Sequence, residues 1–159
     1  MQNIVIVVVV VIIIAGIVSY NYSAEQTRQK GFTFGNELEK IQTDVKELQI
    51  QFYSKKAQWE EGTITQDELF SYYEKHVEKF KEINSQYDKL APPESFQSAV
   101  NLLKLSSQTQ LDSDVQYIEW MKTGDESYKV RSDSQYQESL EYEMSGLVEY
   151  YSAKTGIQP

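Results

Sequence analysis

The apolar residues of this chain follow two patterns, one at its start and another through the remainder. Residues 4–18 are an unbroken run of Ile, Val, Ala and Gly, and no charged residue occurs from Ile4 to Tyr20. As a helix, this segment of 17 residues would be roughly 26 Å long, close to the thickness of a bilayer's hydrocarbon core. We therefore predict a single-pass transmembrane helix, and its anchor residues are Ile4, Val8, Val11, Ile14 and Val18.

Two alternatives for this segment stay open. One is a signal peptide that is cleaved, but Met1-Gln2-Asn3 has no basic residue, and bulky Tyr22 precedes a cut after Ala24 where a small residue is preferred. The other is a core helix buried on every side, since a run of Ile and Val has no polar face to offer water.

The residues after the run give opposing indications of sidedness. Arg28 and Lys30 favour a cytoplasmic location for the rest of the chain. Asn21-Tyr22-Ser23 is an N-glycosylation acceptor pattern, which favours export and makes Asn21 a candidate glycosylation site. The short N-terminal tail and the acidic, Tyr/Gln/Ser-rich composition also favour export. We predict an anchor and juxtamembrane segment over 1–30, and an extracytoplasmic helical domain at the cell membrane over 31–159.

In the second pattern, apolar residues recur every three or four positions, which is the spacing of packed helices. A first helix is predicted over 37–61, with Asn36 as its N-cap. A second begins after the capping box Thr65-Gln66-Asp67-Glu68 and ends before Ala91-Pro92-Pro93. The inner positions of these two helices are predicted to be Leu38, Ile41, Val45, Leu48, Phe52 and Trp59, then Leu69, Tyr73, His76, Phe80, Ile83, Tyr87 and Leu90.

Two further helices are predicted, one from about Pro93 to Gly124 and one from about Asp125 to Lys154. Their inner positions are predicted to be Phe96, Val100, Leu103, Leu111, Ile118 and Met121, then Tyr136, Leu140, Met144, Leu147 and Tyr151. Gly31-Phe32-Thr33-Phe34-Gly35 is predicted to be a helix-breaking linker whose two aromatics lie at the membrane interface or at the end of the bundle. Short links predict an all-α, up-down antiparallel four-helix bundle behind the anchor; a three-helix bundle with an extended anchor helix is the alternative.

The composition excludes several functions. The formal net charge is −9, so the chain would repel the phosphates of nucleic acids, and nucleic acid is not an expected partner. Cysteine is absent, which excludes disulfides, thiolate metal sites and cysteine nucleophiles.

Residues typical of catalysis are sparse. His76 is the only histidine, and position 73 is Tyr, so the Glu-x-x-His pairs of a di-iron bundle are missing; a packed or rim histidine is expected. Asp112-Ser113-Asp114 lacks the Gly and distal Glu of a calcium loop, and its two carboxylates would point to different faces of a helix. Glu138, Glu141 and Glu143 are expected to be solvated. No nucleophile or phosphate-binding motif occurs, so we expect no cofactor, no metal and no enzymatic activity.

Tyrosine is abundant, with 12 residues. Tyr53, Tyr72, Tyr128, Tyr142 and Tyr150 are predicted to lie off the apolar seams. Because Tyr combines apolar area with a hydrogen-bonding tip, it is enriched at interfaces. Tyr142, Tyr150 and Tyr151 are therefore a candidate interaction surface.

The segment from Tyr87 to Phe96, followed by a Gln/Ser-rich helix and Lys122-Thr123-Gly124-Asp125, resembles the uncharacterised membrane-anchored, exported helical-bundle domains of archaea and bacteria. They share a turn in which Leu shortly precedes Pro-Pro (here Leu90-Ala91-Pro92-Pro93), then a helix, Gly-Asp and another helix. The Ile/Val-only anchor looks more archaeal than bacterial. The resemblance implies fold and location only.

Three functions are consistent with these features. The first is a non-enzymatic, anchored interaction or structural module that binds an envelope protein or its own copies. The second is a pilin-like filament subunit, although Val5 occupies the position at which pilins have a glutamate and no basic leader is present. The third is a ligand-sensing helical ectodomain that acts through a partner.

Overall fold

The computed structural model describes residues 25–156, with side chains from Thr33 onward, and this part of the chain is all helical. Its long helices are α2 (Glu25–Glu60), α3 (Gln66–Gln86), α4 (Gln97–Thr123) and α5 (Glu126–Thr155). Two short 3₁₀ turns, Tyr87–Lys89 and Glu94–Phe96, flank the connection from α3 to α4. The prediction of an all-α bundle is confirmed.

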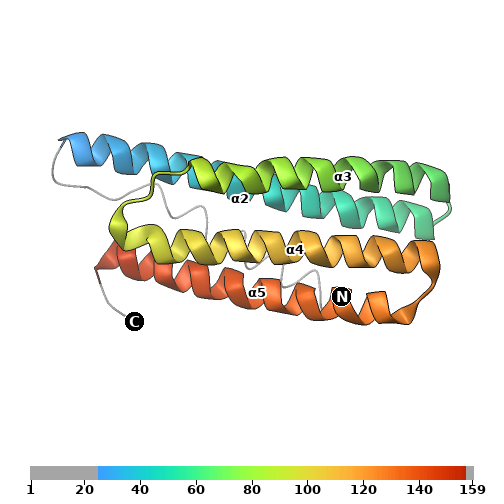
Figure 1. Cartoon of the computed structure of the whole chain (residues 1–159). Helices are drawn as coiled ribbons and strands as arrows, with labels where there is room; N and C mark the ends of the chain where they lie inside the picture. The colour runs from blue at the N-terminus through green and yellow to red at the C-terminus, as the bar shows by residue number, and fades with distance from the viewer. Residues whose placement is uncertain (1–24, 157–159) are drawn as a thin grey trace.

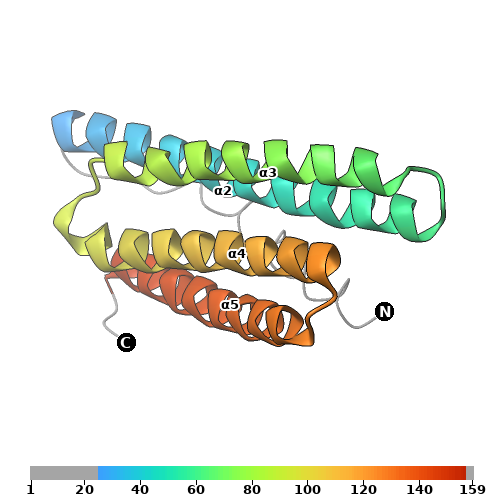
Figure 2. The same cartoon turned by 45° about the vertical axis from the view of Figure 1, so that its right-hand side comes forward.

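The four helices form two hairpins that lie one against the other (Figure 1). One hairpin is α2 and α3, the other is α4 and α5, and successive helices run in opposite directions (Figures 1 and 2). The start of α2, the α3–α4 connection and the end of α5 therefore lie at the same end of the bundle. The opposite end carries the loops α2–α3 and α4–α5.

The predicted start of α3 is confirmed in detail. The backbone N–H of Glu68 donates to the Thr65 hydroxyl at 3.2 Å, and the backbone N–H of Thr65 donates to the Glu68 carboxylate at 2.8 Å. Ile64 and Leu69 pack in the same apolar cluster on either side of this cap. The reciprocal bonds satisfy amide groups that a helix end leaves without partners.

The predicted linker at Gly31–Gly35 is wrong, because α2 continues through it without interruption. Two glycines lower helix propensity by about 1 kcal/mol each, but such a cost is overcome when neighbouring residues are held by packing. Phe34 supplies that packing: its side chain is buried and its ring lies 5.6 Å from the ring of Phe96. It helps to close the end of the bundle, one of the two places predicted for it.

The boundaries around the proline pair also differ from the prediction. Helix α3 ends at Gln86, and Tyr87–Lys89 tightens into a 3₁₀ turn before the extended Leu90. Helix α4 begins at Gln97, not at Pro93, because Glu94–Phe96 forms a separate 3₁₀ turn. At its other end, α4 stops as predicted at Gly124, which adopts the left-handed conformation (φ 72°) that glycine tolerates best.

The buried apolar residues form two clusters, one toward each end of the bundle. The larger cluster lies toward the α3–α4 connection and includes Leu38, Ile41, Phe80, Ile83 and Leu103. The smaller one lies toward the two opposite loops and consists of Phe52, Leu69, Tyr73, Tyr117 and Ile118. Most of the inner positions predicted for α2 and α3 lie in these clusters, so the two seams are confirmed.

The inner face of α5 agrees with the prediction only in part: Leu147 packs against the larger cluster, and Tyr136 and Leu140 also face the interior of the bundle. Its buried residues include Ser132, Ser139 and Gly146, spaced by seven positions, whereas Met144 was predicted inward and is 69% exposed. Gly146 lies directly against Leu103 of α4. Small residues at this spacing allow the backbones of α4 and α5 to approach closely, and large apolar residues are not needed there.

The predicted anchor residues Ile4, Val8, Val11, Ile14 and Val18, and the candidate glycosylation site Asn21, lie outside the described residues. Among the helices of residues 25–156, none is long and apolar enough to cross a membrane.

Candidate functional site

A pair of buried ionisable residues lies between the two apolar clusters. His76 of α3 and Asp114 of α4 are each only 2% exposed, and His76 Nε2 lies 2.7 Å from Asp114 Oδ2. A carboxylate only accepts hydrogen bonds, so Nε2 is the donor. The prediction of a packed histidine is confirmed, and its partner is the inward-facing member of Asp112-Ser113-Asp114.

Two glutamines complete the surroundings of the Asp114 carboxylate. Gln49 of α2 donates from Nε2 to Oδ2 at 3.0 Å, and Gln110 of α4 donates from Nε2 to Oδ1 at 3.0 Å. With His76, three side chains from three helices donate to one carboxylate. Such charge-assisted hydrogen bonds offset the cost of removing the carboxylate from water.

These residues do not make a metal site. Among residues 33–156, no three His, Cys, Asp or Glu side chains come together in a group that could hold a metal ion. His76 is surrounded by aromatic rings instead: its ring centroid lies 4.9 Å from that of Phe52 and 5.6 Å from that of Phe80. As expected for neighbours on a helix, Asp112 points elsewhere and is exposed.

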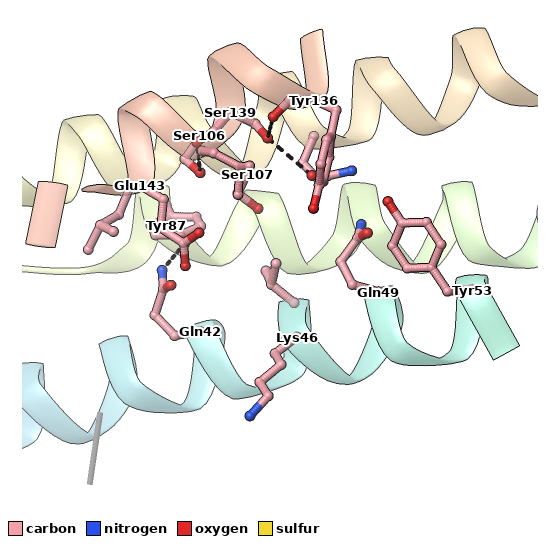
Figure 3. Close-up of a pocket in the computed structure, with 14 residues that line it drawn as sticks. Gln42, Lys46, Gln49, Tyr53, Tyr87, Ser106, Ser107, Tyr136, Ser139 and Glu143 are labelled. Atoms are coloured by element: carbon pink, nitrogen blue, oxygen red, sulfur yellow. Dashed lines mark hydrogen bonds between the residues drawn. The ribbon is translucent and has the colours of Figure 1, made fainter. Parts of the chain in front are cut away.

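A pocket of about 110 Å³ adjoins this polar layer, where α2 and α5 face one another with α3 and α4 behind them (Figure 3). Gln49 and Gln110 belong both to its lining and to the shell of Asp114. The remaining lining side chains are mostly amides, hydroxyls and tyrosines, with a few apolar ones: Gln42, Val45, Lys46, Tyr53, Tyr87, Leu103, Ser106, Ser107, Tyr136, Ser139, Leu140 and Glu143.

Most hydrogen-bond donors of the amide and serine side chains around the pocket are engaged by other protein groups. Gln42 Nε2 donates to the Tyr87 hydroxyl, and Ser107 donates to the side chain of Asn84. Ser106 donates to the carbonyl of Ser139 at 2.8 Å. By contrast, Gln49 Oε1 is a buried acceptor that no described residue satisfies. Gln49 Oε1 is therefore the buried lining atom that a hydrogen-bond donor in the pocket would satisfy.

Glu143 is the acidic side chain in the pocket lining. Burial raises the pKa of the Glu143 carboxyl, and none of the described residues donates a hydrogen bond to it or pairs with it. Burial, and then the charges of Glu143 and Asp114, raise the pKa of the Tyr136 hydroxyl. Lys46 lines the pocket with its aliphatic chain, and Figure 3 shows its ammonium directed away from the other labelled side chains.

The charge of Asp114 also acts on tyrosines outside the pocket. Burial, and then the charge of Asp114, raise the pKa of Tyr72 to about 12. Burial is also the main reason that the pKa of Tyr73 is raised. Both hydroxyls are buried without hydrogen-bond partners among the described residues, so this part of the bundle is poorly solvated.

The three tyrosines predicted as an interaction surface are placed differently from one another. Tyr150 is 6% exposed and its ring packs 5.1 Å from that of Phe96, so its predicted position off the seam is wrong and it belongs to the core. Tyr142 is partly exposed, and its hydroxyl donates to Glu138 at 2.9 Å. Tyr151 is also partly exposed and packs edge-on against Tyr150.

Only part of the predicted acidic surface of α5 is exposed to solvent. Glu138 and Glu141 are exposed as expected, but Glu143 lines the pocket.

The sequence contains a signal for this pocket that is not part of the apolar pattern. On α2, the polar positions Gln42, Lys46, Gln49 and Tyr53 repeat at steps of four, three and four. This polar stripe runs beside the apolar seam of α2, at the same spacing, and all four residues line the pocket.

Comparisons with protein families, with curated proteins and with solved structures found no match to this chain. The site is therefore interpreted from its own geometry and chemistry.

Proposed function

We propose that this chain is a membrane-anchored, extracytoplasmic helical module that acts by binding another protein and has no enzymatic activity. One observation carries the proposal: only residues 21–24 separate the uncharged run Ile4–Tyr20 from the first residue of α2, Glu25. A bundle joined so closely to a membrane-spanning segment would stand at the membrane surface, with no long flexible linker between them.

This attachment would orient the bundle. The start of α2 and the end of α5 share one end of the bundle, so this end would face the membrane (Figure 1). The loops α2–α3 and α4–α5 would then point away from it. Tyr151, near the end of α5, would lie on the membrane-proximal part of the surface and Tyr142 two to three turns above it. An envelope protein or a second copy of the chain is the partner that we propose for this surface.

Cell fractionation tests the anchor. The full chain should sediment with membranes and become soluble in mild detergent, whereas a variant with Val8→Asp and Val11→Asp should leave the membrane fraction. Protease added to intact cells should digest the bundle if it lies outside. A full-length chain that is freely soluble with its N-terminal residues intact would overturn the proposal, and a detergent-resistant polymer would favour the filament subunit instead.

Crosslinking tests the binding surface. Tyr142→Ser together with Tyr151→Ser should reduce crosslinking of the anchored chain to its partner or to its own copies. Tyr128→Ser, near the opposite end of α5, is the matched control and should leave crosslinking unchanged. Equal loss in both variants would indicate a general effect on the bundle and contradict a specific surface.

A second candidate function is ligand sensing through a partner. The pocket between α2 and α5 favours it, because its walls come from both hairpins and a ligand bound there would link them. A ligand that holds the hairpins together raises the free energy of unfolding, and this stabilisation grows with the logarithm of the ligand concentration once the concentration exceeds Kd.

A further inference from the structure

The pocket beside Asp114 has features of a site for a positively charged ligand. Its lining combines a buried acceptor without a partner, a half-buried carboxylate and aromatic rings, and these features come from α2 and α5. Each of them restricts the class of ligand in a different way.

The hydrogen bonding of the pocket favours a ligand that donates. Gln49 uses its Nε2 for Asp114, which leaves the buried Oε1 of the same amide as an acceptor without a partner. Gln110 likewise donates to Asp114, and its Oε1 already accepts from Ser139 at 3.1 Å. A ligand with N–H groups would satisfy Gln49 Oε1, whereas a ligand that only accepts would leave it unpaired. An unpaired buried acceptor is costly.

The electrostatics favour a cation. Glu143 lines the pocket and has no cationic partner among the described residues. The nearby Asp114 is a second carboxylate, and it accepts its hydrogen bonds from the side chains of His76, Gln49 and Gln110. The ammonium of Lys46 is directed away and does not neutralise this charge (Figure 3). A bound cation would stabilise the ionised form of Glu143, and a bound anion would be repelled.

The aromatic lining and the size define the cation further. Tyr53 approaches from α2 and Tyr136 from α5, and both rings lie among the pocket side chains (Figure 3). Ring faces attract cations, including alkylammonium groups. A volume of about 110 Å³ is well below the ~300–1,000 Å³ of sites for drug-sized ligands, so the ligand has few non-hydrogen atoms.

We propose that this pocket binds a small protonated primary amine, with Glu143 as its counter-ion, Gln49 Oε1 as a hydrogen-bond acceptor and the rings of Tyr53 and Tyr136 as its walls. The inference deepens the ligand-sensing candidate and does not depend on the anchored interaction module. The charged amino group lies in the pocket and its short alkyl chain contacts Val45, Leu103 and Leu140, which supply the apolar part of the lining.

Isothermal titration calorimetry on the full chain in detergent tests this inference, with ethylammonium chloride as the probe and sodium chloride at equal ionic strength as the reference. Saturable one-site binding is expected at neutral pH. Ethanol, which is similar in size but uncharged, should bind at least tenfold more weakly. Tetramethylammonium, which carries the charge but no N–H group, should also bind more weakly.

Matched variants identify the site. Glu143→Gln should weaken ethylammonium binding at least tenfold, and Glu141→Gln, an exposed carboxylate on the same helix, should leave it unchanged. Tyr136→Leu should weaken binding because it removes a ring face. Circular dichroism of each variant should show that the helices are retained.

Three outcomes would overturn the inference: no saturable binding of ethylammonium, equal binding by Glu143→Gln and the unaltered chain, or equal binding of ethanol. None of them bears on membrane fractionation or on crosslinking through Tyr142 and Tyr151, so failure of the site and failure of the proposed function are distinguishable.

Discussion

Gly146 of α5 lies so close to Leu103 of α4 that there is no room for a Cβ at position 146. A Cβ placed on Gly146 would lie 2.9 Å from Leu103 Cγ and 3.2 Å from Leu102 Cβ. Ser139, seven positions earlier, accepts a hydrogen bond at its carbonyl from Ser106, and Ser113 donates in the same way to the carbonyl of Ser132 at 2.8 Å. The α4–α5 contact is therefore made by small side chains and by hydrogen bonds to the backbone.

We expect Gly146→Ala to destabilise the bundle by roughly 1–3 kcal/mol, because the added methyl forces α4 and α5 apart. Gly35→Ala is the matched control: it also lies within a helix, but a Cβ added there would have no atom within 4 Å. That substitution should stabilise by about 0.5–1 kcal/mol, since alanine is the better helix former. Urea unfolding of both variants measures the two effects, and the same sign in both would contradict this description of the contact.

The same contact shows why the sequence predicts the first hairpin better than the second. In α2 and α3 the buried positions are large apolar residues, such as Phe52 and Phe80, and their spacing is visible as a hydrophobic pattern. In α5 the buried positions include Ser132, Ser139 and Gly146, and a hydrophobic pattern does not distinguish these from surface residues. The pattern therefore selected Met144, which is exposed.

The pocket could not be predicted from the sequence for a related reason. Glu143 and the polar stripe on α2 have the composition of a solvated face, and only the arrangement of the two hairpins turns them toward a common pocket. The sequence places His76 on the inner face of α3, and Asp114 in the segment Asp112-Ser113-Asp114 of α4. Their pairing depends on the register between α3 and α4, which no local pattern reports.

The shell of Asp114 gives a second prediction. Three donors face this carboxylate, so Asp114→Asn would turn an N–H group toward at least one of them and leave buried groups unpaired. We expect a loss of about 1–3 kcal/mol in the free energy of unfolding. Asp112→Asn on the same helix is exposed and should change stability by less than about 0.5 kcal/mol. Equal effects in urea unfolding would mean that the buried shell contributes nothing specific.

The hydroxyl of Tyr73 gives a third prediction. Tyr73 is fully buried, its ring stacks on that of Phe52 at 4.6 Å, and its hydroxyl has no hydrogen-bond partner among the described residues. We expect Tyr73→Phe to stabilise by up to about 1 kcal/mol, because it removes a buried, unpaired polar group. Tyr73→Ala should instead cost about 3–5 kcal/mol by deleting the ring. A destabilised Tyr73→Phe in thermal unfolding would show that the hydroxyl has a partner.

The fourth prediction concerns the pH dependence of stability and rests on Glu143. Burial raises the pKa of this carboxyl in the folded state, so the folded chain holds the proton more tightly than the unfolded chain does. The contribution of Glu143 to stability is therefore fully present below the unfolded pKa of about 4.3 and is lost as pH rises through the higher folded pKa. Glu143→Gln mimics the protonated form at every pH.

Urea unfolding of this variant and of the unaltered chain should consequently give similar stabilities near pH 4, with the variant more stable near pH 7. Glu141→Gln, at an exposed position, should show no such divergence. If the Glu143→Gln difference had the opposite sign at neutral pH, Glu143 would have to be paired in the folded chain. A half-buried carboxylate without a partner costs stability in the empty pocket and would be stabilised by a bound cation. The variant predicted to be the more stable is therefore also the one predicted to lose ethylammonium binding.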